Sequence, residues 1–515
     1  MAKYEVKDGV GIIPEWATEI EDEAFKYCKE LKSVVIPQWV KKIGDYAFDG
    51  CENLTEITLP EWVEEIEDLA FCGCENLKSI TLPRWVKKIG YGAFSCCSSL
   101  TSITIPPSVK EIGKDAFSYC SSLTSITVSK DNKFYDSRED CNAIIHTGSN
   151  TLISGCMNTV IPPSVTEIGE GTFYGCSSLT SISIPESVTE IGDHAFFDCS
   201  SLTSITIPPS VTEIGDRAFS YCSSLTSITV SKDNKFYDSR EDCNAIIRTE
   251  SNTLIRGCEN TIIPPSVTEI GSSAFSGCSS LTSIAIPPSV TEIGGWAFDG
   301  CSSLTSISIP PSVTWIGART FRGCSSLASI SIPPSVTEIG WDAFHGCSSL
   351  TSISIPPSVT EIGSSAFSGC SSLTDITIPE SVTKIGDWAF DGCSSLTSIS
   401  IPPSVRRIGG GAFRDCSSLT TVKVSKDTEI GYNAFKDCYS LSNTNITSSE
   451  IMSRSNVLKG GNDSNYNNES DYVYDYDEPS YGRYSGSYAQ DVEGWSDDDI
   501  DEVFDGDPDA YWNID

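Results

Sequence analysis

The residues of this chain that could do chemistry are its cysteines and its three histidines. The histidines, His146, His194 and His345, lie far apart in the sequence, and no G-x-S-x-G, P-loop or H-E-x-x-H motif accompanies them. The 22 cysteines include no C-x-x-C pair, so they do not indicate a zinc site. We therefore expect no catalytic residues, no bound metal and no cofactor, and we expect that the chain is not an enzyme.

Most of the cysteines follow one rule of spacing. Sixteen of them lie three residues after a regularly spaced phenylalanine, from Cys28 to Cys438, which is typical of a column of small buried side chains. The other six are Cys72, Cys96, Cys141, Cys156, Cys243 and Cys258. Disulfides Cys141–Cys156 and Cys243–Cys258 could each close a hairpin, but free thiols are the expectation because the N-terminus shows no secretory signal.

The elements that position these residues repeat every 23 residues. The repeat phenylalanines are Phe25, Phe48, Phe71, Phe94, Phe117, Phe173, Phe196, Phe219, Phe275, Phe298, Phe321, Phe344, Phe367, Phe390, Phe413 and Phe435. Sixteen units of this length predict a solenoid, in which each unit buries its apolar edge against its neighbours.

One repeat, "SVTEIGSSAFSGCSSLTSIAIPP" from Ser266 to Pro288, shows the expected local structure. "LTSIAI" is rich in β-branched residues and predicts a strand facing inward at Leu281, Ile284 and Ile286. "SVTEI" predicts a shorter strand, and "SSAFSGC" predicts a helical or 3₁₀ turn. The expected fold class is an α/β leucine-rich-repeat solenoid dominated by β-strands, over residues 1–445.

The pattern L-x-x-I-x-I-P-x-S-V-x-x-I-G-x-x-A-F-x-x-C resembles the leucine-rich repeats of the BspA-like family, over residues from about 11 to 445. The resemblance implies a leucine-rich-repeat fold and an interaction or adhesion role, often at a bacterial surface. It implies no catalysis.

Two insertions of 33 residues interrupt the period, near residues 129–161 and 231–263. The stretch from Phe117 to Ile145 recurs unchanged from Phe219 to Ile247, inside a block copied at a distance of 102 residues. "NAIIHTGSNTLISGC" predicts a hairpin within the insertion. The copies differ at His146 and Arg248, and at Ser154 and Arg256, so these positions are where a function of the insertion would lie.

Large aromatic and basic residues break the uniform pattern in the later repeats. Specific interfaces usually depend on a few aromatic or arginine anchors. Candidate partner-binding residues are therefore Trp296, Trp315, Arg319, Arg322, Trp341, His345 and Trp388. Drift at exposed turns is an equally good account of them.

Three other columns are candidate surfaces. Trp16, Trp39, Trp62 and Trp85 recur every 23 residues and would form an aromatic strip, either packing against its own neighbours or binding sugar rings or a partner chain. A column of glutamates from Glu167 to Glu361 should face water or attract cations. Thr and Ser residues on the long strands, such as Thr203, Ser204 and Thr206, either keep the sheet soluble or bind glycans.

Charge and the C-terminal segment limit the partners. With 34 Lys and Arg against 70 Asp and Glu, the net charge of -36 disfavours nucleic acid and anionic membranes. Residues 446–490 predict a disordered linker. In residues 491–515 an acidic helix would present Ile500, Val503 and Phe504 on one face, either for docking or merely as part of a solubilising tail.

The sequence thus predicts a monomeric, non-enzymatic protein that binds a protein or a glycan, as in adhesion. The alternatives are an intracellular scaffold whose acidic tail docks a partner or acts as a sorting signal, and a glycan hydrolase. No stretch is apolar enough to cross a membrane. Without a recognisable signal peptide the expected location is the cytoplasm, and the alternative is the cell surface or export by a signal-independent route.

Overall fold

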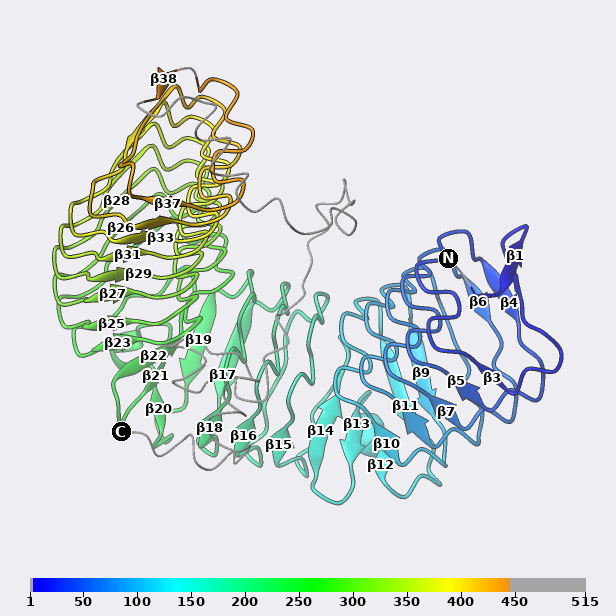
Figure 1. Ribbon diagram of the computed structural model, residues 1–515. Helices are drawn as coiled ribbons and strands as arrows, with labels where there is room; N and C mark the ends of the chain where they lie inside the picture. The colour runs from blue at the N-terminus through cyan, green and yellow to red at the C-terminus, as the bar shows by residue number, and fades with distance from the viewer. Residues whose placement is uncertain (1–2, 442, 445–515) are drawn as a thin grey trace, which may run out of the picture. The chain divides into compact units, whose positions relative to one another are not determined.

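The computed structural model describes residues 3–441 and 443–444, and in this part of the chain each 23-residue repeat forms one level, or rung, of a solenoid (Figure 1). In fourteen of the sixteen rungs a strand of two to four residues forms where the sequence predicts the longer strand, and these strands make up a parallel ladder that is divided among several sheets. These longer strands are β4 (Ser33–Val35), β6 (Glu56–Ile57), β9 (Ser102–Ile105), β11 (Ser125–Val128), β17 (Ser204–Ile207), β19 (Ser227–Val230), β24 (Ser283–Ile284), β26 (Ser306–Ser308), β28 (Ser329–Ser331), β30 (Ser352–Ser354), β32 (Asp375–Thr377), β34 (Ser398–Ser400), β36 (Thr421–Lys423) and β38 (Asn443–Thr444).

A second parallel ladder is built from two-residue strands in the "SVTEI" segments, which confirms the shorter strand expected there. Its members are β3 (Glu19–Ile20), β5 (Lys42–Ile43), β7 (Glu65–Ile66), β8 (Lys88–Ile89), β10 (Glu111–Ile112), β15 (Glu167–Ile168), β16 (Glu190–Ile191), β18 (Glu213–Ile214), β23 (Glu269–Ile270), β25 (Glu292–Ile293), β27 (Trp315–Ile316), β29 (Glu338–Ile339), β31 (Glu361–Ile362), β33 (Lys384–Ile385), β35 (Arg407–Ile408) and β37 (Glu429–Ile430). At the N-terminal end β1 (Glu5–Lys7) and β2 (Val10–Ile12) form an antiparallel hairpin, and β2 pairs with β4.

The segment around each repeat phenylalanine is not the helical or 3₁₀ turn that its length suggests. Two residues per repeat adopt left-handed backbone angles, one two positions before the phenylalanine and one two positions after it, such as Trp296 (φ 54°) and Gly300 (φ 70°). Left-handed residues end a right-handed helix. They also direct alternate N–H groups to the next rung: Trp296 N–H, Phe298 N–H and Gly300 N–H all donate to carbonyls one rung further on, at 2.8–2.9 Å. The segment is therefore a pair of turns with hydrogen bonds between rungs.

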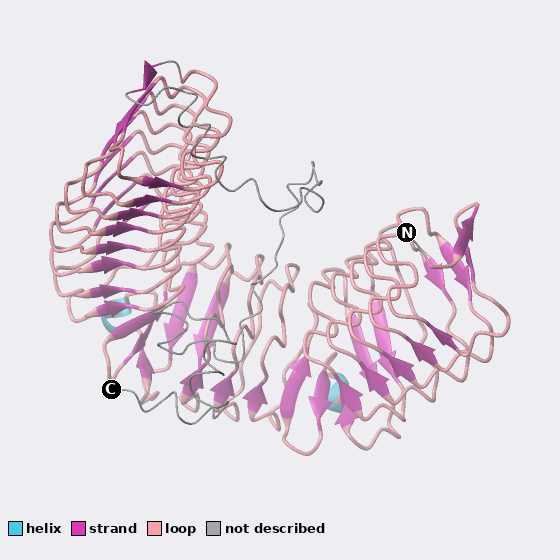
Figure 2. Cartoon of the chain, in the orientation of Figure 1, coloured by secondary structure: helices cyan, strands magenta, loops and turns pink. Residues whose placement is uncertain are grey.

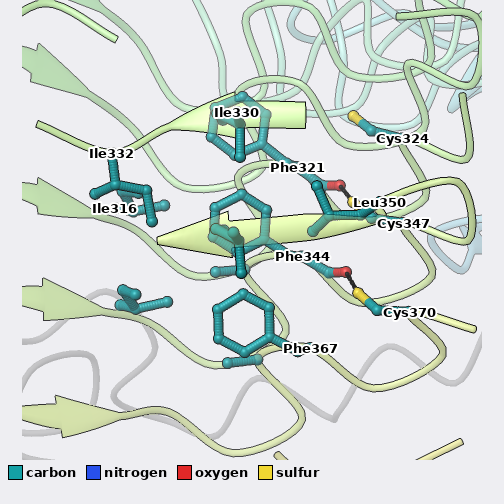
Figure 3. Packing of buried hydrophobic residues seen from close by; sticks show 14 of the residues in the cluster. Ile316, Phe321, Cys324, Ile330, Ile332, Phe344, Cys347, Leu350, Phe367 and Cys370 are labelled. Atoms are coloured by element: carbon teal, nitrogen blue, oxygen red, sulfur yellow. Dashed lines mark hydrogen bonds between the residues drawn. The ribbon is translucent and has the colours of Figure 1, made fainter. Parts of the chain in front are cut away.

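The core is a column of phenylalanine rings flanked by a column of cysteines. Neighbouring rings have centroids between 5.0 and 5.6 Å apart and lie nearly parallel. Figure 3 shows Phe321, Phe344 and Phe367 with the thiols beside them. The carbonyl of Phe321 accepts the N–H of Cys324 at 3.2 Å and the thiol of Cys347, from the next rung, at 3.2 Å. Thirteen of the sixteen column cysteines are buried, as predicted, and most of the thiols donate to a carbonyl of the preceding rung, as in Cys324 and Cys370.

The two insertions add strands to the sheets of the short-strand ladder (Figure 2). The first contains β12 (Tyr135–Asp136), the 3₁₀ helix η1 (Arg138–Asp140), β13 (Ile144–His146) and β14 (Thr151–Ser154). The second contains β20 (Tyr237–Asp238), η2 (Arg240–Asp242), β21 (Ile246–Arg248) and β22 (Thr253–Arg256). In each, the last two strands make an antiparallel hairpin whose second strand joins the short-strand ladder of the following rung.

Each insertion interrupts the column of phenylalanines, so the core separates into three clusters. The first extends from Ile13 to Ile126 with Tyr135, Ile144 and Cys156, and the second begins at Cys141. The third begins at Cys243 and continues to Phe435. At the second break Gly257 packs against Phe275, the first ring of the next column. A Cβ atom at this position would come within 2.2 Å of the Phe275 ring.

No disulfide joins cysteines in the described residues. The Cys141 thiol lies 3.8 Å from the Ala143 carbonyl, whereas the Cys156 thiol donates to the Asn142 carbonyl at 3.3 Å. Within the same part of the chain, no helix has the length and apolarity that crossing a bilayer requires.

Candidate functional site

A group of arginine and tryptophan side chains gathers on the turn surface between the second and third core clusters. We call Arg217, Trp296, Arg319, Trp341 and Asp342 the Arg–Trp cluster. Four of the five occupy the left-handed position two residues before a repeat phenylalanine, and Trp341 precedes that position by one residue. Because this position recurs once in each rung, side chains of neighbouring rungs lie along one line, and Arg217 reaches Trp296 across the small side chain of Ser273.

Cations and rings alternate along this line. The Arg217 guanidinium lies 4.5 Å from the centre of the Trp296 ring, and that of Arg319 lies 4.3 Å from the centre of the Trp341 ring and 5.8 Å from that of Trp296. The two indoles meet edge to face, with centroids 5.7 Å apart. Arg319 Nε also lies 3.1 Å from Asp342 Oδ2, so its guanidinium is held between two rings and a carboxylate.

A buried carboxylate lies beside the cluster. Asp299 is 3% exposed; Tyr221 donates a hydrogen bond to it, and Arg322 Nη1 lies 4.0 Å from the same Oδ2 atom. Burial raises the pKa of Asp299, and the Tyr221 hydrogen bond and Arg322 oppose this shift. Burial, followed by the charge of Asp299, raises the pKa of Tyr221. The Asp299 carboxylate thus lies between the Tyr221 hydroxyl and the Arg322 guanidinium.

His345 lies next to this group, and its backbone N–H donates to the Asp342 carbonyl at 3.0 Å. Burial lowers the pKa of its imidazole; Asp342 opposes the shift, and Arg322 and Arg319 add to it. Nδ1 is buried without a hydrogen-bond partner among the described residues.

The structure brings together five of the seven candidate partner-binding residues, namely Trp296, Arg319, Arg322, Trp341 and His345. Trp315 lies on the short-strand ladder, paired in register with Glu338, and Trp388 lies two rungs beyond Asp342, packed over Gly411. The sequence analysis missed Arg217, Tyr221 and Asp299. Arg217 and Trp296 share the column two residues before the phenylalanine, and the insertion of 33 residues between their rungs concealed their proximity.

The N-terminal tryptophans form a regular exposed column. Trp16, Trp39, Trp62 and Trp85 are 80%, 59%, 49% and 41% exposed, respectively. None of these four indoles stacks on another; Arg84 lies over the Trp85 ring at 5.1 Å. They are therefore separate exposed rings and do not form a continuous stacked strip.

The remaining candidate surfaces are polar. Hydroxyls on the long-strand ladder bond to one another or to backbone carbonyls of the preceding rung, as in the pair Thr206–Thr229 at 2.9 Å and the bond from Thr203 to the Thr180 carbonyl at 3.3 Å. This use of the hydroxyls fits a role in keeping the sheet soluble. Ile500, Val503 and Phe504 lie outside the described residues.

One carboxylate group has the spacing of a metal site. Side-chain oxygens of Asp45, Glu67 and Asp68 lie within 4.8 Å of one another. Lys42 and Lys88 both form ion pairs with Glu67, at 3.0 and 2.5 Å. These ammonium groups supply the positive charge that a cation would bring, so the group is satisfied as it stands.

Comparison with known proteins assigns the family. A family model described as a BspA type leucine rich repeat region, in six copies, matches residues 18–140, 153–244, 255–372 and 337–460, which is most of the chain. The chain belongs to this BspA-type family. No functionally curated protein matches it.

Solved structures include similar BspA-type and other leucine-rich-repeat proteins. One is a leucine rich cell surface protein from Faecalibacterium prausnitzii, 33% identical, with 72% of this chain and 88% of that chain covered and a TM-score of 0.44. Another is a leucine-rich repeat protein from Bacteroides ovatus, 30% identical, with 82% and 91% covered and a TM-score of 0.31. Membership of this family implies a binding role for the chain. The names of the two relatives identify no partner.

Proposed function

We propose that this BspA-type protein is a non-enzymatic adhesion protein and that the Arg–Trp cluster is its contact surface for a protein partner. The observation that carries the proposal is the alternation of arginines and indoles within contact distance along one line. Trp and Arg are the residues most enriched among those that dominate binding energy at protein interfaces.

The cluster is also held in place before any partner arrives. Arg319 is held by Trp341 and Asp342, and Arg217 lies over the ring of Trp296. Ordering a flexible side chain at an interface costs about 0.5 to 1.5 kcal/mol. A partner that presents carboxylate and aromatic groups would therefore meet a surface whose side chains need little further ordering.

The binding test compares the full chain with two variants. In the first, Trp296 and Trp341 are replaced by Ser. The control is Trp388→Ser, which removes an exposed indole from the same column but outside the cluster. A protein captured from native cells is identified by mass spectrometry, purified and titrated. We expect at least about tenfold weaker binding for the double variant, as for the loss of an interface anchor, and unchanged binding for the control.

Equal binding by all three proteins would reject the cluster as the contact surface. Adhesion further requires exposure at the cell exterior, for which the surface location in the name of one relative is the support. Labelling intact native cells with an impermeant biotin reagent tests this part separately. A protein labelled only after lysis could still bind a partner, but it could not act in adhesion.

A further inference from the structure

The two insertions are copies, yet the surfaces beneath them differ. The second insertion borders a cavity of about 390 Å³ that is lined by residues of β18, β22 and β23. The matching cavity under the first insertion measures about 10 Å³. Ligand pockets usually occupy about 300 to 1,000 Å³. Only the second site has room for a small organic molecule.

Charge differs between the copies in the same place. Six aligned positions around the first site hold Lys114, Asp115, His146, Ser154, Glu167 and Glu170, giving a formal charge of 1 minus 3, or -2. The aligned positions of the second site hold Asp216, Arg217, Arg248, Arg256, Glu269 and Ser272, giving 3 minus 2, or +1. A basic cavity has formed in a chain whose net charge is -36.

Arg256 is the central feature of this cavity. Its side chain is 2% exposed, and Nη1 donates to the carbonyls of Ser276 at 2.9 Å and Ser273 at 3.4 Å. Nη2 lies 3.7 Å from the Cys278 sulfur, and Nε is buried without a hydrogen-bond partner. No carboxylate of the described residues lies within 4.0 Å of its guanidinium. A buried charge that has neutral partners only is costly unless an opposite charge joins it.

Other groups around the cavity fit an anion bearing hydroxyls. Arg248 is exposed on β21, and Ser251 and Ser272 offer exposed hydroxyls to the same space. Glu269 on β23 pairs with Thr253 on β22, and its Oε2 accepts the hydroxyl of Thr253 at 2.8 Å. An arginine binds phosphate or sulfate oxygens through parallel hydrogen bonds, which a single buried guanidinium with a vacant Nε can supply.

We propose that this cavity binds a small organic molecule through its phosphate or sulfate group, with Arg256 as the main ligand-binding residue and Arg248 at the entrance. This cavity would bind a small anion, whereas the Arg–Trp cluster would contact a protein. Arg217 borders both sites. The proposal assigns a use to two of the five substitutions by which the copied insertions differ, Ser154 to Arg256 and His146 to Arg248.

The test uses the full chain and isothermal titration with sodium phosphate, sodium sulfate, glucose 6-phosphate and glucose, at constant ionic strength set with sodium chloride. We expect saturable binding of the three anionic probes and none of glucose. Arg256→Ser, which restores the residue of the first copy, should weaken binding by about tenfold or more, as expected for a lost charge-assisted contact. Arg407→Ser, on β35 and remote from the cavity, is the control and should bind as the unmodified chain does.

Two further measurements separate binding from a structural role. Without ligand, Arg256→Ser should melt at the same temperature as the unmodified chain or higher, because the substitution removes an uncompensated buried charge. Ser154→Arg should add no second binding site, because its cavity is too small. The proposal is overturned if no anionic probe binds, if glucose binds as well as glucose 6-phosphate, or if Arg256→Ser leaves phosphate binding unchanged.

Discussion

At the scale of single residues, the cysteine column shows one side chain serving the backbone of the neighbouring repeat. Cys370, for example, donates its thiol to the Phe344 carbonyl at 3.3 Å (Figure 3). Burial raises the pKa of the Cys370 thiol, and it raises that of Cys347 to about 12. An alanine at this position would fill less space and leave one lone pair of the carbonyl unused, which explains why a small residue with a weak donor suits the position.

The thiol of Cys96 is expected to behave differently from the column. It is partly exposed, and a hydrogen bond from Cys72 lowers its pKa below the usual value, with burial opposing the shift. The thiolate is the form that reacts. Iodoacetamide at pH 7.5 should therefore modify Cys96 before the buried cysteines, as peptide mass spectrometry can show.

Variants of Cys72 test the cause of this reactivity. Cys72→Ala removes the donor and should slow the modification of Cys96 severalfold, whereas Cys72→Ser keeps a donor and should preserve most of the rate. Modification of a column thiol such as Cys370 as fast as Cys96 would contradict the explanation.

At the scale of elements, the short-strand ladder places glutamates in register on consecutive rungs. Glu190 on β16 pairs with Glu167 on β15 and with Glu213 on β18. Burial raises the pKa of Glu190, and the charges of Glu167 and Glu213 raise it further. The glutamate column thus carries repulsion between rungs, which the parallel strands and the isoleucine beside each glutamate must overcome.

Replacing Glu190 by Gln should stabilise the protein at pH 7. A raised pKa in the folded state means that folding is most favoured when the group is protonated, and that this advantage is lost as the pH rises through the folded pKa. Removing the charge should gain about 0.5 kcal/mol at pH 7, the size of a cross-strand charge pair. The gain should vanish at pH 3, where Glu190 is protonated, when thermal unfolding is followed at both pH values.

A matched control lies on the same ladder. Glu361 on β31 forms an ion pair with Lys384 on the next rung, at 3.5 Å. Glu361→Gln should give less gain than Glu190→Gln at pH 7, because Lys384 attracts Glu361 on one side while Glu338 repels it on the other. Equal stabilisation by both substitutions would mean that repulsion between rungs is not the cause.

The sequence predicted the elements well where one rung repeats the next. Leu281, Ile284 and Ile286 face the core as expected, since alternation along a strand fixes which side chains point inward. The turn around each phenylalanine was wrongly expected to be helical, because its left-handed residues include Trp296 and Arg319, which have no intrinsic preference for that region. Their backbone is set by hydrogen bonds to the next rung, which a single repeat does not reveal.

The candidate site was predictable only in part for a related reason. Arg319, Trp296 and Trp341 could be placed together by counting 23 residues along the chain. The contact of Arg217 with Trp296 spans an insertion, so counting along the chain does not predict it. The rungs of Phe219 and Phe275 are adjacent in the structure, where Tyr221 N–H donates to the Ser276 carbonyl at 3.0 Å.

At the scale of the whole described solenoid, the three core clusters should unfold as separate cooperative blocks. Rungs within a block share stacked phenylalanines, whereas Phe117 and Phe219 are followed by insertions and have no ring partner on that side. Stability of repeat proteins is a sum of such neighbour terms, so weak interfaces divide the unfolding transition. Urea unfolding of the full chain should therefore show more than one step.

Tryptophan fluorescence can assign the steps. The first block contains Trp16, Trp39, Trp62 and Trp85, and residues 141–258 contain no tryptophan. Replacing these four by Phe should remove the unfolding step of the first block from the fluorescence signal. Circular dichroism should still show every step. A single transition with the same midpoint by both methods would show that the insertions couple the blocks fully.

The left-handed position before each phenylalanine also has a practical consequence for protein engineering. It already accepts Tyr46, Leu69, His194, Arg217 and Trp388 with nearly the same backbone angle. A library that randomises this column in several adjacent rungs would vary a continuous strip of surface while the framework of hydrogen bonds stays constant. Selection from such a library could give the solenoid new binding specificities.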